Sequence, residues 1–203
     1  MKIKKLSTIL KKRKRAIIFE RQSSNGIVFQ YISDGSALYP IYGLPRLRKE
    51  SLLTILDIPQ EKWSDWHVSV KDGPEGMNLT DVDETESQAF PTFYSLQVGE
   101  KTMMPLETEY NGVLFLDRKY LNPISDAAGF SYFKRQDKAG NDYIAVKEGL
   151  LILAVIMPVR MVTPDFCERT REFQLRCTKE MVCGNMPKNI LIDMDKLEQE
   201  EEQ

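Results

Sequence analysis

Residues 149–159 form the longest apolar run of the chain, and this run restricts the fold more than any other feature. A helix that crosses a bilayer core needs roughly 20 apolar residues, about twice what the run provides, so we expect no membrane span. The side chains stay apolar on both faces of an extended chain until Pro158, which is typical of a strand buried within a sheet. The sequence therefore predicts a buried strand over 150–162.

The composition is that of an ordinary globular protein of 203 residues, 42% hydrophobic and 29% charged, with a formal net charge of −2. A chain of this length buries roughly 70% of the surface that it exposes when unfolded, so its core needs no covalent staples. Three cysteines are too few for a paired disulfide framework, and residues 1–15 lack the apolar segment of a secretory signal. We therefore expect a reducing compartment, a bacterial cytoplasm.

Apolar, β-branched runs predict a strand-rich body. The Asn-Gly pairs at 25–26 and 111–112 indicate hairpin turns. The polar, acidic stretch over 71–88 contains Asp-Gly-Pro and Glu-Gly steps, and it is expected to be an exposed loop. The expected strands span 16–20, 27–32, 66–70, 93–98, 101–109, 113–116, 130–135, 143–146 and 150–162.

Helical spacing predicts helices over 49–57, 117–127 and 164–182, so the expected fold class is α+β. The second of these helices is imperfect because Pro123 lies inside it. The third has Thr163 as an N-cap and Gly184 at its C-terminal end. One of its faces is expected to belong to the core; this face contains Phe166, Thr170, Phe173, Cys177 and Met181.

Charge is concentrated at the two ends of the chain. Residues 1–15 contain eight Lys or Arg and no acid, whereas 193–203 contain six acids and one Lys, which we expect to form a frayed tail. Apolar residues recur at helical spacing among the N-terminal cations and predict a basic amphipathic helix; they are Ile3, Leu6, Ile9 and Leu10. This helix either contacts nucleic-acid phosphates or another polyanion, or docks on the body through its apolar face.

A short internal similarity indicates two related units. Residues 25–29 (Asn-Gly-Ile-Val-Phe) resemble 111–115 (Asn-Gly-Val-Leu-Phe), and a predicted helix and further strands follow each of them. We therefore expect two strand–helix–strands repeats, over 16–90 and 91–162. The expected organisation is a basic helix over 1–15, an α+β body over 16–162, and a C-terminal helix with an acidic tail over 163–203.

No residue pattern typical of catalysis or metal binding is present in the sequence. His67 is the single histidine, which excludes the usual sites with two histidine ligands, and the cysteines lack the spacing of a metal-binding pair. There is no phosphate-binding loop, dinucleotide fingerprint or nucleophile elbow. We expect a non-enzymatic protein without cofactor or metal, in which His67 is a partly buried structural residue rather than a catalytic one.

Several short motifs follow one another in the second half of the chain. Val-Gly-Glu-Lys at 98–101 precedes Glu-Tyr-Asn-Gly-Val-Leu-Phe at 109–115 and Lys-Tyr-Leu at 119–121, and the strand over 150–161 ends in Met-Pro-Val-Arg-Met. In this order and spacing, the motifs resemble the last module of the bacterial DNA sliding clamp, the β subunit of DNA polymerase III. A weaker similarity covers Asp-Gly, Tyr-Pro and Leu-Pro pairs between residues 34 and 45.

The resemblance implies a clamp-like module of two strand–helix–strands repeats, with helices that face double-stranded DNA and sheets that form the outside. It also implies a polymerase or replication accessory factor, of a phage or mobile element, that forms a homo-oligomer. A ring needs a weak electrostatic lining and no base readout. The candidate DNA-binding residues are Lys4, Lys5, Lys11, Lys12, Arg13, Lys14, Arg15, Arg46, Arg48, Lys49, Arg118 and Lys119.

The clamp family also has a hydrophobic pocket for short peptide motifs of replication proteins. The resemblance places it at Met157, Pro158, Val159, Arg160 and Met161, although core packing is the alternative for Met157 and Val159. The implied fold requires helices 49–57 and 117–127 to lie together on one side of the sheet, related by a pseudo-twofold axis. The alternative function is a protein-interaction or structural module that keeps the fold without binding DNA.

Overall fold

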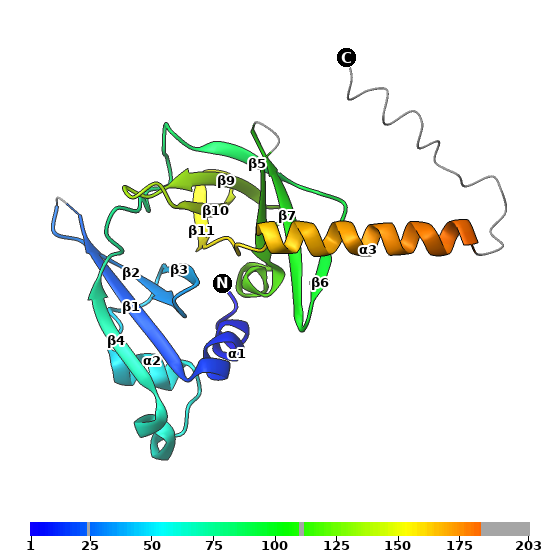
Figure 1. The fold of residues 1–203 in the computed structure, drawn as a ribbon. Helices are drawn as coiled ribbons and strands as arrows, with labels where there is room; N and C mark the ends of the chain where they lie inside the picture. The colour runs from blue at the N-terminus through cyan, green and yellow to red at the C-terminus, as the bar shows by residue number, and fades with distance from the viewer. Residues whose placement is uncertain (24, 110–111, 184–203) are drawn as a thin grey trace. The chain divides into compact units, whose positions relative to one another are not determined.

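The computed structural model describes residues 1–23, 25–109 and 112–183. It divides into two compact units, residues 1–159 and residues 160–203. The first unit is a mixed α+β structure with one large sheet (Figure 1). Its strands are β1 (Arg15–Gln22), β2 (Val28–Ser33), β3 (Ala37–Ile41), β4 (His67–Asp72), β5 (Ser87–Pro91), β6 (Leu96–Val98), β7 (Lys101–Thr108), β8 (Gly112–Asp117), β9 (Ser131–Gln136), β10 (Asp142–Glu148) and β11 (Leu151–Ile156).

Short helices accompany this sheet. They include α1 (Ile3–Arg13), α2 (Lys49–Ile55) and the 3₁₀ helices η1 (Gln60–Asp65) and η3 (Arg118–Ile124). The second unit contains α3 (Pro164–Cys183). Within the described ranges, no helix is both long and apolar enough to cross a membrane.

Two antiparallel three-stranded meanders, β1-β2-β3 and β9-β10-β11, form the centre of the sheet. They join where Leu38 of β3 pairs with Val155 of β11. The full strand order is β4-β1-β2-β3-β11-β10-β9-β5-β7-β6, with β8 paired to β7. In each meander, the last strand in the chain lies at the β3–β11 junction and the first strand lies farthest from it. The two meanders are therefore arranged alike on either side of the junction.

A helix leads into each meander: α1 precedes β1, and η3 precedes β9. The strand order thus makes α1 the counterpart of η3, and α1 packs directly against η3. The repeat expected over 16–90 and 91–162 pairs the helices differently, because it matches the helix over 49–57 to the one over 117–127. Residues 28–29 and 112–115 of the similar pentapeptides lie in β2 and β8, and β2 is followed by another strand rather than by a helix.

Strand β11 is buried on both faces, as its apolar run predicts. Its residues contribute to two hydrophobic clusters, Ala154 and Ile156 to a large one and Ile152 and Val155 to a smaller one, and an irregularity in the pairing with β10 separates Ile152 from Ala154. The large cluster also contains the buried residues of α1, α2 and η3, so these helices cover one face of the sheet. The strand ends at Ile156 rather than at residue 162, because Pro158 cannot donate to the ladder.

Helix α1 docks on the body through its apolar side. Leu6, Ile9 and Leu10 are buried in the large cluster, and the hydroxyl of Ser7 donates to the carbonyl oxygen of Leu56 at 2.9 Å. The helix turns its lysine and arginine side chains to solvent. Docking and a free basic face therefore occur in the same helix.

The helix expected over 117–127 is a shorter 3₁₀ helix, η3. Pro123 lies inside it, and proline lacks the N–H that an α-helix needs at this position. The side chain of Asp117 caps the helix by accepting a hydrogen bond from the backbone N–H of Lys119 at 3.2 Å. Tyr120 and Ile124 are buried, while Arg118 is exposed.

The described part of the second unit does not by itself provide a core for the apolar face of the C-terminal helix. Thr163 caps α3 as expected, because its hydroxyl accepts a hydrogen bond from the N–H of Phe166 at 3.1 Å. However, Phe166 and Phe173 are exposed, the latter to 68%. A helical period identifies an apolar face but does not say what covers it. The side chain of Met181 and residue Gly184 lie outside the described part of the chain.

Candidate nucleic-acid interface

The exposed side of α1 carries a dense set of cations. Lys4, Lys11 and Lys12 are exposed, and none of the three has an acidic partner in the part of the chain that the structure describes. Three cations within or next to α1 form ion pairs with acids outside the helix. These pairs are Lys2 with Asp126, Arg13 with Asp34 (3.9 Å) and, just after the helix, Lys14 with Asp65 (2.9 Å).

Helix η3 brings further cations next to α1. The ammonium group of Lys5 donates to the hydroxyl of Ser125 at 3.1 Å, which ties α1 to the end of η3. Lys119 pairs with the carboxylate of Asp117 at 3.0 Å and lies 4.6 Å from the ring centroid of Tyr120. Burial alone would lower the pKa of Lys119, but the hydrogen bond and charge of Asp117 outweigh burial and raise it. Lys119 therefore stays charged at neutral pH.

A cavity of about 380 Å³ lies between α1 and η3. Side chains of both helices and of the turn after β2 line it. They are Lys5, Thr8, Ile9, Lys12, Arg13, Asp34, Lys119 and Asn122. Four of these eight residues are cationic, and we call this space the α1–η3 cavity.

Asp34 is the acidic residue of the α1–η3 cavity, and the fold holds it in place. It is 3% exposed, and one oxygen accepts the backbone N–H groups of Ser36 (2.8 Å) and Ala37 (3.1 Å). The other oxygen accepts the hydroxyl of Tyr120 at 3.0 Å. Burial, and then the negative charge of Asp34, raises the pKa of Tyr39, whose hydroxyl donates to the carbonyl oxygen of Tyr120. Asp34 thus links the β2–β3 turn to η3.

Not all predicted DNA-binding residues join this surface. Arg46 is bound to Glu20, with its Nε donating at 2.9 Å, and this hydrogen bond lowers the pKa of Glu20 despite partial burial. Arg48 and Lys49 are exposed at the start of α2, and neither lines the α1–η3 cavity. Arg15 is exposed just after α1, and Arg118 is exposed at the start of η3. The structure therefore gathers the N-terminal cations and Lys119 and leaves the α2 cations apart.

The predicted peptide pocket is divided between the two units. Met157, Pro158 and Val159 belong to the first unit, whereas Arg160 and Met161 belong to the second. Met157 packs against the smaller hydrophobic cluster, and the N–H of Val159 donates to the carbonyl oxygen of Phe115 at 2.7 Å. None of the five residues lines the α1–η3 cavity.

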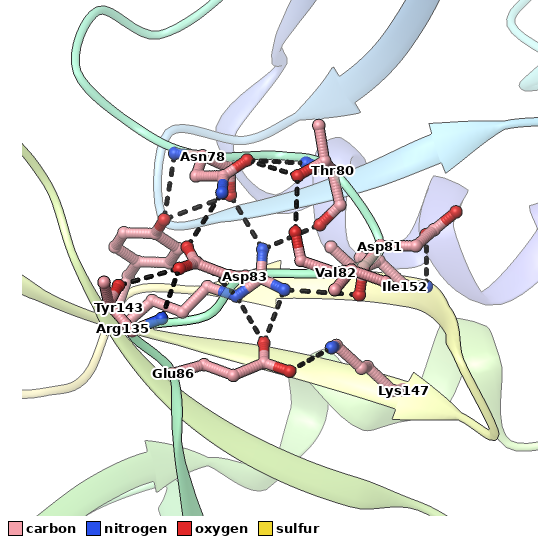
Figure 2. A network of polar contacts seen from close by, with 11 residues as sticks. Asn78, Thr80, Asp81, Val82, Asp83, Glu86, Arg135, Tyr143, Lys147 and Ile152 are labelled. Atoms are coloured by element: carbon pink, nitrogen blue, oxygen red, sulfur yellow. Dashed lines mark hydrogen bonds and ion pairs between the residues drawn. The ribbon is translucent and has the colours of Figure 1, made fainter.

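A polar network that the sequence did not reveal anchors the loop over 73–86, which we call the strap (Figure 2). Arg135, 1% exposed, binds the carboxylate of Glu86 through Nε (2.7 Å) and Nη2, and Lys147 binds the same carboxylate. Arg135 Nη1 also donates to the carbonyl oxygens of Asn78 (2.9 Å) and Thr80 (2.8 Å). These bonds hold the strap against the sheet.

The strap corrects the prediction of an exposed loop over 71–88. Strand β4 includes residues 71–72 and strand β5 includes residues 87–88 of the expected loop, and Leu79 of the strap is buried in the smaller cluster. The N–H of Ile152 donates to the carboxylate of Asp81 at 2.9 Å. The sequence contains both the acids of the strap and the cations Arg135 and Lys147. Pairing them, however, requires the sheet order.

His67 is exposed on the outermost strand, β4, rather than partly buried. Its backbone N–H donates to the carbonyl oxygen of Lys14 at 3.0 Å. Within the described residues, no group of three His, Cys, Asp or Glu side chains could hold a metal ion. Comparisons of the chain with protein-family models, with curated proteins and with solved structures found no match.

Proposed function

We propose that this is a non-enzymatic, DNA-associated protein that contacts the phosphate backbone through α1 and η3. The observation that carries the proposal is the exposed set of Lys4, Lys11 and Lys12, which has no acidic partner among the described residues, on a helix that is docked beside the cations of η3. A solvated surface helix commonly neutralises its cations with acids one turn away. Helix α1 contains no acid at all.

Lysine-rich contacts of this kind suit binding without sequence readout. Phosphates offer charge but no base identity, so a rigid array of ammonium groups binds any duplex and releases its counterions. The docking of Leu6 and Leu10 holds the helix axis in place before DNA arrives. Little conformational entropy is then lost on binding.

The finer proposal is a clamp-like accessory role in replication. Two meanders of the same order, each entered by a helix, with α1 and η3 packed together on one face of the sheet, support it. The segment that resembles the clamp module runs from β6 to β11. Under this proposal α1, and not α2, is the partner of η3 in the DNA-facing pair. The DNA-facing surface formed by α1 and η3 then contains more cations than the surface expected from the helices over 49–57 and 117–127.

The experiment is fluorescence anisotropy of a labelled duplex titrated with the full chain at several salt concentrations. We expect log K to fall linearly with log salt, with a slope of about −0.9 for each phosphate contacted. The double variant Lys4→Gln/Lys11→Gln should bind more weakly and reduce the slope by about two. Lys71→Gln/Lys138→Gln removes two exposed lysines from β4 and from the turn after β9, and it should leave the slope unchanged. Absence of binding to linear and circular DNA at low salt would refute the proposal.

A second candidate, a protein-interaction module that does not bind DNA, is favoured by a different surface. Residues 90–98, at the β5–β6 side of the sheet, expose several large apolar side chains, including Phe93 and Tyr94. Exposed apolar side chains next to an unpaired strand edge are typical of association sites. Light scattering coupled to size exclusion tests it: a stable oligomer that ignores DNA favours this candidate, and a monomer that binds DNA excludes it.

A further inference from the structure

The α1–η3 cavity has the size of a small-ligand site rather than of a gap between side chains. Its volume of about 380 Å³ lies within the roughly 300–1,000 Å³ that such sites occupy. The lining combines Lys5, Lys12 and Arg13 with the amide of Asn122 and the apolar side chain of Ile9. These residues could hold a charged group together with a small organic body.

The lining carries positive charge that its own acids do not neutralise. Lys5, Lys12, Arg13 and Lys119 face two carboxylates, Asp34 in the lining and Asp117 behind Lys119, which leaves an excess of two positive charges. Asp34 does not obstruct an anion, because backbone N–H groups and the hydroxyl of Tyr120 already occupy both of its oxygens.

A doubly negative ligand fits this excess better than a singly negative one. A phosphodiester within a DNA strand carries one negative charge, whereas a terminal phosphate carries about 1.5–2 negative charges at pH 7. Lysine ammonium groups donate to its oxygens, and the guanidinium fork of Arg13 can bind two of them at once. Asn122 and Thr8 supply neutral donors for a sugar oxygen.

We infer that the α1–η3 cavity binds a phosphomonoester, the terminal phosphate of a DNA strand. The inference deepens the proposed function and rests on it, because the strand has to lie along α1 for its end to enter the cavity. It distinguishes this protein from one that only slides, since a strand end is held at a defined place.

The test compares two labelled duplexes of identical sequence, one with 5′-phosphates and one with 5′-hydroxyl groups. Wild-type protein should bind the phosphorylated duplex about tenfold more tightly, as expected for at least one added hydrogen bond between charged groups. Lys5→Gln/Lys12→Gln should abolish this preference. Lys4→Gln/Lys11→Gln removes the same charge from the same helix outside the cavity, and it should weaken both duplexes alike.

The possible outcomes separate this inference from the proposed function. Equal affinity of the wild-type protein for both duplexes, or equal loss of preference in the two double variants, overturns the inference and leaves DNA binding standing. Failure to bind either duplex overturns both. A free nucleotide carries the same phosphomonoester as a strand end, and calorimetry with deoxyadenosine 5′-monophosphate tests whether the cavity binds it. If the protein bound this nucleotide but no duplex, the assignment to a strand end would be overturned. Matching thermal melts of the two variants confirm that both are folded.

Discussion

Replacing Glu86 by Gln should destabilise the first unit by about 3–5 kcal/mol, the range seen when one member of a buried ion pair is removed. Glu86 accepts hydrogen bonds from Arg135 and from Lys147, whose side chains are 0% and 4% exposed. The neutral amide keeps a single acceptor oxygen, and its NH₂ group faces a cation. At least one buried cation therefore loses its partner, and water cannot easily take the place of the carboxylate.

The remaining acid does not compensate for this loss. The carboxylate of Asp83 lies 3.9 Å from Nε of Arg135, beyond hydrogen-bond distance, and it already accepts from Asn78 at 2.9 Å. Among the hydrogen bonds of the described residues, the carbonyl oxygens of the strap accept from Arg135, whereas Lys147 donates to Glu86. We therefore expect the strap to detach from the sheet, which would expose Leu79.

Urea unfolding followed by circular dichroism measures the effect. With a dependence on urea of about 1–3 kcal/mol per molar, the midpoint should fall by roughly 2 M. Glu84→Gln is the matched control, because Glu84 lies in the same strap and is exposed; it should stay within about 0.5 kcal/mol of the wild type. A Glu86→Gln midpoint that coincides with that of the control would refute the reasoning, since it would mean that the buried network adds nothing to stability.

Three further predictions concern the core, the response to acid and the C-terminal helix. Leu10→Ala should cost about 2–5 kcal/mol in the free energy of unfolding, because the Leu10 side chain of α1 is fully buried in the large cluster; a loss below about 1 kcal/mol in urea titrations would mean that α1 is not part of the core. Burial raises the pKa of Asp83, but hydrogen bonds from Thr85 and Asn78 outweigh it and lower this pKa below 3.8. The ionised Asp83 therefore stabilises the folded protein above pH 3.8, and this stabilisation is lost as the pH falls through the pKa of the folded state. In thermal melts, Asp83→Asn should lose less stability than the wild type between pH 5 and pH 2. Phe173→Ser should leave the melting temperature within about 1 °C, because the side chain is exposed; a large drop would show that it is buried after all.

Local patterns were sufficient for most strands and for α1. The β1–β2 hairpin around Asn25-Gly26 and the apolar spacing of Leu6, Ile9 and Leu10 depend on neighbours within a few residues, so the sequence expresses them directly. The N-cap of α3 at Thr163 is equally local. The cations of the candidate interface could also be named, because charge needs no fold to be recognised.

What the sequence could not supply is which segments meet. Asp34 reaches Tyr120 across 86 residues, and Arg135 reaches Glu86 across 49. The role of α1 as counterpart of η3 follows from the pairing of β3 with β11, which no local period encodes. Local patterns were also insufficient for two other segments. The apolar period of α3 indicated a core face, and the polar composition of the strap indicated a solvated loop. Whether an apolar face is covered, or a buried charge finds its partner, depends on free energies of contact between distant segments, and these contacts exist only once the sheet has set its strand order.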